Sequence, residues 1–300
     1  MKKIKELRQY NSRTADPLTE PSNWYLRAIT RFDDKENIVE EIIYENENTL
    51  ESKTEYRYDN QQRLIEKVVY LSENEVGEKF SYTYNENNQL ATETQHYADG
   101  SQTVRIFNYS DSRITITIND EEGSLEGQEI KLLQNGKITE EITLDEDKNE
   151  TSHLYYTFND AGLVESRIEK NAAGEMESLR RYFYNERNEM IELTELTGDG
   201  ELISRRTFEY DEFNRLVQEN IDGYSVNYTY NENGKRSREE IINPMQIIES
   251  FTDYEYEGDK VIRTVSCNKG NLMGHDSSGK SIRSAYLISK FEYDYYPDSE

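Results

Sequence analysis

The 300-residue chain has little that could cross-link it or anchor it in a membrane. One cysteine, Cys267, excludes an internal disulfide and fits a reducing compartment. No apolar run approaches the roughly 18 residues of a spanning helix. The N-terminus, MKKIKELRQYNSRTADP, starts with basic residues but lacks the apolar stretch of a signal peptide. These absences predict a cytoplasmic protein.

Aliphatic and basic residues are also scarce. Leu, Ile, Val and Phe total 63 of 300 residues, or 21%, close to the roughly 20% below which chains are typically disordered. Lys and Arg number 35 against 61 Asp and Glu, which gives a net charge of −26. That charge repels nucleic acid and anionic membranes and attracts a basic protein or a cation. Alternatively, the acidity only keeps an extended protein soluble.

Aromatic residues are abundant, and their spacing argues against disorder. They make up 11% of the chain, with 24 tyrosines, and many occur as aromatic-x-aromatic pairs. The second ring of each pair recurs about every 26 residues, with one degenerate copy near Leu133. These rings are Phe32, Tyr58, Tyr84, Tyr109, Phe158, Tyr184, Tyr210, Tyr230, Tyr256 and Tyr293. A fixed period of this length is the signature of a repeat protein.

Each repeat has the pattern of a β-hairpin. Alternate residues on a strand share a face, so Tyr56 and Tyr58 lie together, as do Phe208 and Tyr210. A four-residue turn follows, opened by Asp or Asn, whose side chain can bond the main chain two residues on. Asn or Gly closes the turn because that position needs a positive φ. Examples are residues 85–88, 185–188, 211–214 and 231–234.

About ten such repeats predict an all-β fold: an extended antiparallel meander of about twenty strands that forms a twisted or spiral sheet. The tyrosine face is expected to line its inner side. Exposed terminal strands of such a sheet could pair and dimerise.

The segments from Tyr56 to Leu64 and from Phe208 to Leu216 resemble YD repeats, also called RHS repeats, whose pattern is roughly Tyr-x-Tyr-Asp-x-x-Gly-Arg-Leu. The resemblance covers roughly residues 28–296 and implies a bacterial origin and a spiral β-sheet. In large members of that family the sheet encloses a toxin domain. Here the period is longer, Asn often replaces the turn glycine, and neither an autoproteolytic closing segment nor a toxin domain follows.

Two segments depart from the period. Residues 1–25 are predicted to be an N-terminal cap, with a short helix from Lys3 to Tyr10, ahead of a repeat array over residues 26–300. Within the array, residues 266–290 form an irregular insertion with a net charge of +3, from three lysines and one arginine against Asp276. Such a long loop is either functional or a mobile insertion.

No catalytic constellation is present. His96 and His153 are predicted to be surface residues near repeat loops, and Cys267 with His275 lacks a third orienting group. Asp145, Asp147 and Asn149 hint at a calcium loop but lack the required glycine and distal glutamate, so a solvated turn is expected. We predict neither enzymatic activity nor a metal or cofactor.

The composition and fold together favour a non-enzymatic protein-binding module of a bacterial cell. The partner would be a basic protein, and the module could be an immunity protein neutralising a toxin, or an adaptor or chaperone for an effector. The alternative is a carbohydrate-binding or cell-surface protein, because exposed rings can stack on sugars. The residues expected to bind a partner are Tyr58, Tyr84, Tyr184, Tyr210, Tyr230, Lys280 and Arg283.

Overall fold

The computed structural model describes residues 2–46, 49–268, 274–275, 281–282 and 286–297. Twenty-two strands form an antiparallel meander, which confirms the all-β prediction, and β22 (Gly274–His275) pairs separately with β23 (Ser281–Ile282). No helix within the described residues is long and apolar enough to cross a membrane. The 22 strands are β1 Ile4–Thr14, β2 Tyr25–Phe32, β3 Ile38–Asn46, β4 Thr49–Tyr58, β5 Leu64–Ser72, β6 Glu75–Tyr84, β7 Leu90–Tyr97, β8 Gln102–Tyr109, β9 Arg113–Asn119, β10 Leu125–Gln134, β11 Lys137–Leu144, β12 Glu150–Phe158, β13 Val164–Asn171, β14 Met176–Tyr184, β15 Met190–Thr197, β16 Leu202–Tyr210, β17 Leu216–Ile221, β18 Tyr224–Tyr230, β19 Arg236–Ile242, β20 Ile248–Glu257, β21 Lys260–Asn268 and β24 Tyr286–Tyr295.

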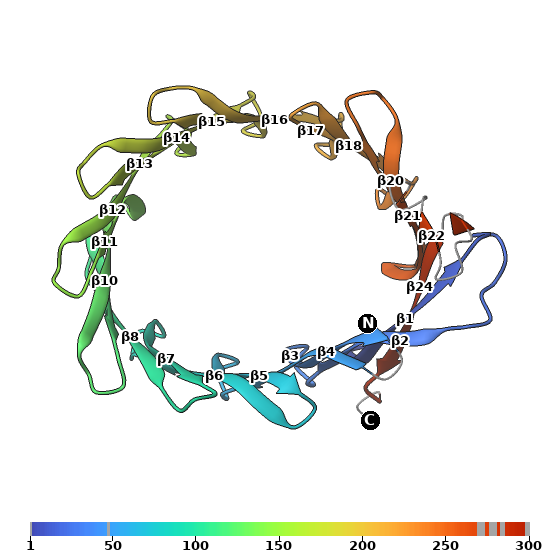
Figure 1. Ribbon diagram of the computed structural model, residues 1–300, viewed down its shortest axis with the longest axis horizontal. Coiled ribbons are helices and arrows are strands. Elements are labelled where there is room, and N and C mark those ends of the chain that lie inside the picture. Colours follow the sequence, from blue (N-terminus) through green and yellow to red (C-terminus); the bar gives the residue numbers. More distant parts are fainter. Residues whose placement is uncertain (1, 47–48, 269–273, 276–280, 283–285, 298–300) are drawn as a thin grey trace. The chain divides into compact units, whose positions relative to one another are not determined.

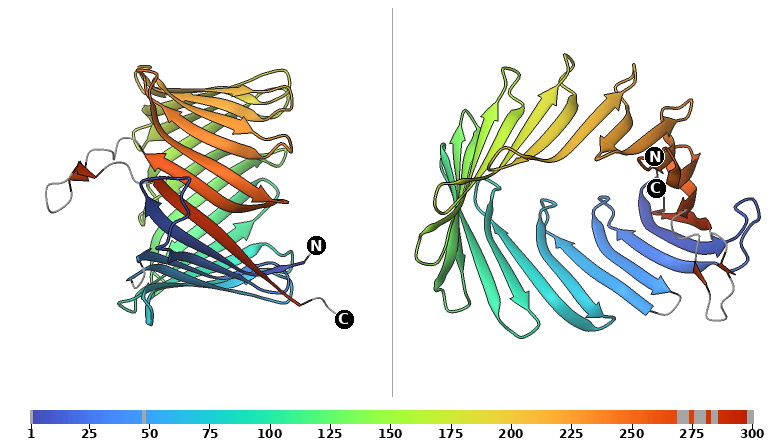
Figure 2. Two further views of the ribbon diagram at one scale, coloured as in Figure 1. Left: turned by 90° about the vertical axis from the view of Figure 1, so that its right-hand side faces the viewer. Right: turned by 45° about the horizontal axis from the view of Figure 1, so that its top comes forward.

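The chain divides into two compact units. Unit 1 comprises Met1–Arg57, Val69–Val76 and Glu209–Glu300, and unit 2 comprises Tyr58–Val68 and Gly77–Phe208. Figure 2 shows the strands of each unit as one layer. Unit 2 therefore contains most of the regular hairpins, whereas unit 1 contains both ends of the chain.

In unit 1, the N-terminal segment is a strand, so the predicted helix from Lys3 to Tyr10 is wrong. Strand β1 lies between β2 and β24 (Figure 1), with Leu7 opposite both Thr30 and Tyr293. Pairing on both edges outweighs the weak local preference of this segment for a helix. The Glu6 carboxylate also accepts a hydrogen bond of 2.7 Å from the Arg31 guanidinium of β2.

The pairing of β1 with β24 corrects three further predictions. The first and last strands of the meander satisfy each other's main-chain hydrogen bonds, so the sheet is not an open spiral with two free edges. The sequence analysis allowed dimerisation through exposed terminal strands. This is also ruled out, because β1 and β24 pair with each other and leave no free edge on that side. Residues 4–14 thus belong to the sheet and are not a cap outside it.

The repeated turns have the predicted chemistry. In the turn of residues 185–188, the Asn185 Oδ1 accepts hydrogen bonds from the main-chain N–H groups of Arg187 and Glu189, at 2.9 and 3.0 Å. Asn188 closes the turn with φ of 64°. The same bonding opens the turns at Asp59, Asn85, Asp211 and Asn231. The pairing register shifts, as at a β-bulge, where the aromatic arm ends, for example between Phe183 and Tyr184.

Six of the aromatic arms are each tied to the preceding hairpin by a tyrosine. The Tyr184 hydroxyl donates a hydrogen bond of 2.8 Å to the Val164 carbonyl, at the start of the preceding return strand. Five other tyrosines repeat the contact at 2.7–3.0 Å. Their pairs are Tyr84 with Leu64, Tyr109 with Leu90, Tyr230 with Leu216, Tyr256 with Arg236 and Tyr293 with Val261. This contact, called the tyrosine tie below, explains why the second ring of each pair is so often tyrosine.

Basic side chains add further contacts between successive hairpins, both at a tyrosine tie and where phenylalanine takes its place. Arg63 stacks its guanidinium 4.5 Å from the Tyr84 ring centroid and donates a hydrogen bond of 2.8 Å to the Asn88 side chain in the next turn. Lys137 lies 5.0 Å from the Phe158 ring centroid and donates to the Gly162 carbonyl at 2.6 Å. A cation over a ring contributes about 0.5–1 kcal/mol at an exposed site. Successive repeats are therefore joined by side chains as well as by the sheet.

The sheet has little conventional core. Among the described residues only eight hydrophobic side chains are buried: Ile29, Ile42, Val68, Ile116, Ile130, Val265, Cys267 and Ile288. The accessible surface is 19054 Å², against about 13,000 Å² for a compact protein of this mass. Most strand residues are half-buried on both faces, so contacts between strands supply much of the stability.

Asn188 tests the backbone requirement of the turn. Replacing Asn188 with Ala places an ordinary side chain at φ of 64°, whereas glycine adopts this conformation without strain. We expect Asn188→Ala to be about 1 kcal/mol less stable than Asn188→Gly in urea unfolding. Equal stabilities would contradict the assignment.

The Tyr184→Phe variant tests the tyrosine tie, because it removes one hydroxyl and leaves the Val164 carbonyl without this donor. We expect a loss of about 1 kcal/mol in the free energy of unfolding. Tyr224→Phe is the control, since the Tyr224 ring is exposed and should change stability by less than about 0.5 kcal/mol. Indistinguishable variants would show that the tie adds nothing.

Candidate functional site

The structure places the predicted tyrosines in the framework of the sheet. The hydroxyls of Tyr84, Tyr184 and Tyr230 are donated to main-chain carbonyls, and their rings are half-buried. Tyr58 ends β4 and Tyr210 ends β16, both half-buried as well. Lys280 and Arg283 lie outside the described residues. The tyrosine hydroxyls engaged in ties are therefore already occupied within the fold.

In unit 2, charged side chains form rows between the tyrosines. Tyr82 lies opposite Glu93, and Glu93 opposite Arg105, so all three share the tyrosine face. Arg105 forms an ion pair with Glu129 at 2.7 Å. Further along, Lys131 pairs with Glu141 at 3.0 Å and Arg180 with Glu195 at 2.8 Å. Each exposed pair contributes only about 0.2–1 kcal/mol, but the row satisfies charges on a face that has no second layer.

Unit 1 has a similar row on its β1–β4 strands. Glu6 bonds Arg31, Arg31 pairs with Glu40, and Lys53 lies 3.6 Å from Glu40 and 2.7 Å from Glu55. Opposite charges alternate across four strands. Many of the scarce basic groups are thus engaged inside the sheet.

The acidic groups that stay exposed include a regular set at one end of the hairpins. We call the turns that follow the aromatic arms the aromatic-end turns. In six of these turns the second residue is an exposed acid: Asp34, Glu86, Asp160, Glu186, Glu212 and Glu232. None of these six carboxylates has a hydrogen bond or ion pair among the described residues, although the main-chain carbonyl of Asp34 accepts a hydrogen bond of 2.6 Å from Lys3. The turns at the opposite end are less regular, since Ala172 and Pro244 occupy the same position.

His153 contradicts the prediction of a surface histidine. It lies within β12, is 8% exposed, and stacks on Tyr155 with 3.9 Å between ring centroids. Its Nε2 is 2.9 Å from Glu140, and its Nδ1 is 2.9 Å from the Tyr155 hydroxyl and 3.2 Å from Glu150. Burial, and the Glu140 and Glu150 charges, raise the pKa of Tyr155. The two carboxylates contact the two ring nitrogens of the imidazole, so His153 links Glu140 and Glu150 and has a structural role.

Other candidates from the sequence have structural roles. Cys267 is buried on β21. Asp145 accepts hydrogen bonds from the main-chain and side-chain N–H groups of Asn149, so its carboxylate is used within the turn. No group of three or more His, Cys, Asp or Glu side chains that could hold a metal ion occurs in the part of the chain described by the structure.

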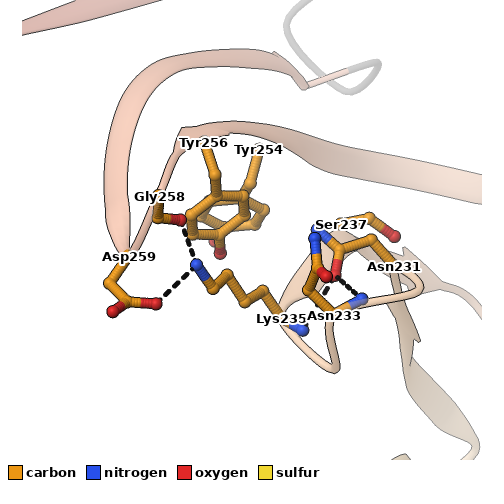
Figure 3. A pocket seen from close by; sticks show the side chains of 8 residues that line it. All are labelled: Asn231, Asn233, Lys235, Ser237, Tyr254, Tyr256, Gly258 and Asp259. Atoms are coloured by element: carbon orange, nitrogen blue, oxygen red, sulfur yellow. Dashed lines mark hydrogen bonds and ion pairs between the residues drawn. The ribbon is translucent and has the colours of Figure 1, made fainter.

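A polar pocket lies at the aromatic end of unit 1, between the β18–β19 and β20–β21 hairpins (Figure 3). Its lining is Asn231, Asn233, Lys235, Ser237, Tyr254, Tyr256, Gly258 and Asp259. The Lys235 ammonium pairs with Asp259 at 2.7 Å and donates to the Gly258 carbonyl. Sequence reasoning missed this pocket. The available signal was the length of one turn. Gly258–Asp259 is a two-residue turn, whereas most aromatic arms are followed by a longer turn.

Comparisons with known proteins match the chain to one family model and to several solved structures. Residues 22–135 match the model of a family described as an uncharacterised protein. No curated protein matches the chain. Among solved structures, porin-like proteins from Bacteroides uniformis ATCC 8492 and Bacteroides vulgatus ATCC 8482 are 11% and 7% identical. The first match covers 97% of this chain and 96% of the other with a TM-score of 0.35; the second covers 99% and 100% with a TM-score of 0.26.

A third solved structure is the TcdB2-TccC3-Cdc42 complex, at 9% identity and a TM-score of 0.28. The match covers 88% of this chain and 23% of the other. The cytoplasmic location predicted from the sequence is withdrawn: it rested on absent apolar segments alone, and two of the matched structures are described as porin-like.

The Asx turns predict a pH dependence. The main-chain N–H of Arg63 bonds Asp59 and outweighs partial desolvation in holding the pKa of Asp59 below its ordinary value, with help from the Arg63 side chain. A carboxylate with a lowered folded-state pKa stabilises the fold above its unfolded pKa of about 3.9 and loses this contribution as pH falls through the folded value. Asp59 therefore contributes to acid unfolding below about pH 4.

An Asp59→Asn variant should keep the turn and remove this titration. We expect its urea midpoint to fall less steeply below about pH 4 than that of the unmodified protein. Asn85→Asp, at the same position of the next hairpin, should steepen the fall. Parallel pH profiles for all three proteins would contradict the assignment.

Proposed function

We propose that the protein is a non-enzymatic binding module for a basic protein, with the aromatic-end carboxylates as the contact groups. The observation that carries this proposal is the exposed, unpaired acid at the second position of six aromatic-end turns. An immunity or adaptor function is one form that such binding would take. No sequence motif or described side-chain cluster suggests a reaction.

The spacing of the carboxylates supports a protein partner. Successive aromatic-end turns within a unit are two strands apart, which is roughly 10 Å at the strand spacing of a sheet. Asp160 and Glu186 in unit 2 stand in this relation, as do Glu212 and Glu232 in unit 1. A row at this interval can meet several lysine or arginine side chains of one surface. Excess negative charge would also speed the encounter with a basic partner.

A charge-matched pair of variants tests the contact surface. In unit 2, Glu86→Gln, Asp160→Asn and Glu186→Gln remove three charges from the aromatic end. Glu121→Gln, Glu146→Gln and Asp199→Asn remove three exposed charges from the opposite end. Tagged proteins are used to capture partners from the native cell at low salt and at about 0.5 M salt, where exposed charges are screened.

We expect a basic partner to be captured by the unmodified protein and by the opposite-end variant at low salt. The aromatic-end variant should lose most of the captured partner. High salt should release the partner from the unmodified protein and from the opposite-end variant. Capture of no basic protein, or equal loss from both variants, would overturn the proposal.

A further inference from the structure

The polar pocket of unit 1 has the chemistry of a small-ligand site, and one aromatic-end turn, residues 231–234, contributes Asn231 and Asn233 to its lining. It occupies about 480 Å³, within the roughly 300–1,000 Å³ of known small-molecule sites. It exists because β20 returns to β21 through the two-residue turn Gly258–Asp259. A four-residue turn, such as residues 231–234 in the preceding hairpin, would reach further past the Tyr254 and Tyr256 side chains and fill this space.

The charge in the pocket is balanced. Lys235 and Asp259 form an ion pair of 2.7 Å, and the ammonium also bonds the Gly258 carbonyl and lies 5.5 Å from the Tyr256 ring centroid. The place for a cation beside Tyr256 is therefore already filled by the protein's own lysine. An anion would meet the exposed Asp259 carboxylate, whose side chain is 78% exposed. These contacts favour a neutral ligand.

The remaining lining groups both donate and accept hydrogen bonds. The side chains of Asn233 and Ser237 have no partner among the described residues and line the pocket. The Asn231 Oδ1 is used by the turn, where it accepts from the main-chain N–H groups of Asn233 and Lys235 at 3.0 Å. An amide and a hydroxyl together suit a ligand with several hydroxyl groups.

Two tyrosine rings supply the apolar part of the pocket. Figure 3 shows Tyr254 and Tyr256 beside each other, facing Lys235. The Tyr256 hydroxyl is fixed to the Arg236 carbonyl at 2.8 Å, so this ring is already ordered before a ligand arrives. The negative face of an aromatic ring attracts the C–H groups of a sugar ring, which carry partial positive charge.

We propose that this pocket binds a neutral sugar unit, with the tyrosines against its C–H groups and Asn233 and Ser237 on its hydroxyls. The carboxylates of the aromatic-end turns and their partner do not enter this assignment, although Asn233 belongs to the same turn as Glu232. It stands on the balanced ion pair, the ordered ring and the unpartnered polar side chains of one hairpin pair.

The test is titration with two neutral oligosaccharides, maltotriose and N,N′-diacetylchitobiose, followed by saturation-transfer NMR and calorimetry. The full-length protein should bind at least one of them saturably. Asn233→Ala should weaken that affinity by about fivefold, the effect of one hydrogen bond. Asn87→Ala is the matched control, because Asn87 occupies the same turn position in another hairpin and its main-chain N–H bonds Asn85 as that of Asn233 bonds Asn231.

A second variant keeps every lining side chain except those of the short turn. Replacing Gly258–Asp259 with the four-residue sequence of residues 231–234 should abolish binding, while circular dichroism shows the sheet intact. Affinity for a neutral sugar should be unchanged at about 0.5 M salt, unlike capture of a basic protein, so the two proposals fail independently. No saturable binding of either sugar, or equal affinities in Asn233→Ala and Asn87→Ala, would overturn the proposal.

Discussion

Six of the aromatic arms are each held to the preceding hairpin by a hydroxyl that reaches the main chain of another strand, and this tyrosine tie organises the rest of the structure. The donor is the second ring of an aromatic pair, and the acceptor is the carbonyl at the start of the preceding return strand, as in Tyr184 with Val164. A single-layer sheet has no opposing layer to fix the relation between hairpins. The tie fixes it by bonding a side chain to backbone that the turn has already positioned.

The same constraint determines where the charges go. With few apolar residues to bury, the sheet covers its faces with half-buried rings and with rows of ion pairs, such as Lys131 with Glu141. Burial would raise the pKa of Glu141, but hydrogen bonds from Lys131 and Tyr156 and the charges of Lys131 and Arg167 hold it below its ordinary value. Basic side chains used in this way leave an excess of carboxylates, and the regular ones appear on the aromatic-end turns.

The local parts of this fold could be predicted from the sequence because their causes are local. The aromatic period gave the hairpins, and the turn residues predicted both the bonds to Asn185 and the positive φ of Asn188. The pairing of β1 with β24 could not be predicted, since it joins residues about 280 positions apart and β1 carries no aromatic pair.

Side-chain environments were harder to predict than the strands themselves. The neighbours that bury His153 come from β11 and β12, and the acceptor of each tie lies on the preceding return strand, which the period alone does not identify. The pocket depends on the shortness of the Gly258–Asp259 turn, and the sequence alone does not show that the neighbouring turn and two tyrosines enclose a space there. The predicted location rested on the absence of apolar segments, which says little about where a sheet resides.

The heat capacity of unfolding tests the central claim, that hairpin-to-hairpin contacts stabilise this sheet in place of an apolar core. Compact proteins give about 12–15 cal/mol/K per residue, because unfolding exposes buried apolar surface. A sheet with so few buried aliphatic side chains should give a value clearly below that range in calorimetry. A value within the range would mean that an ordinary hydrophobic core carries the stability, and the account would be wrong.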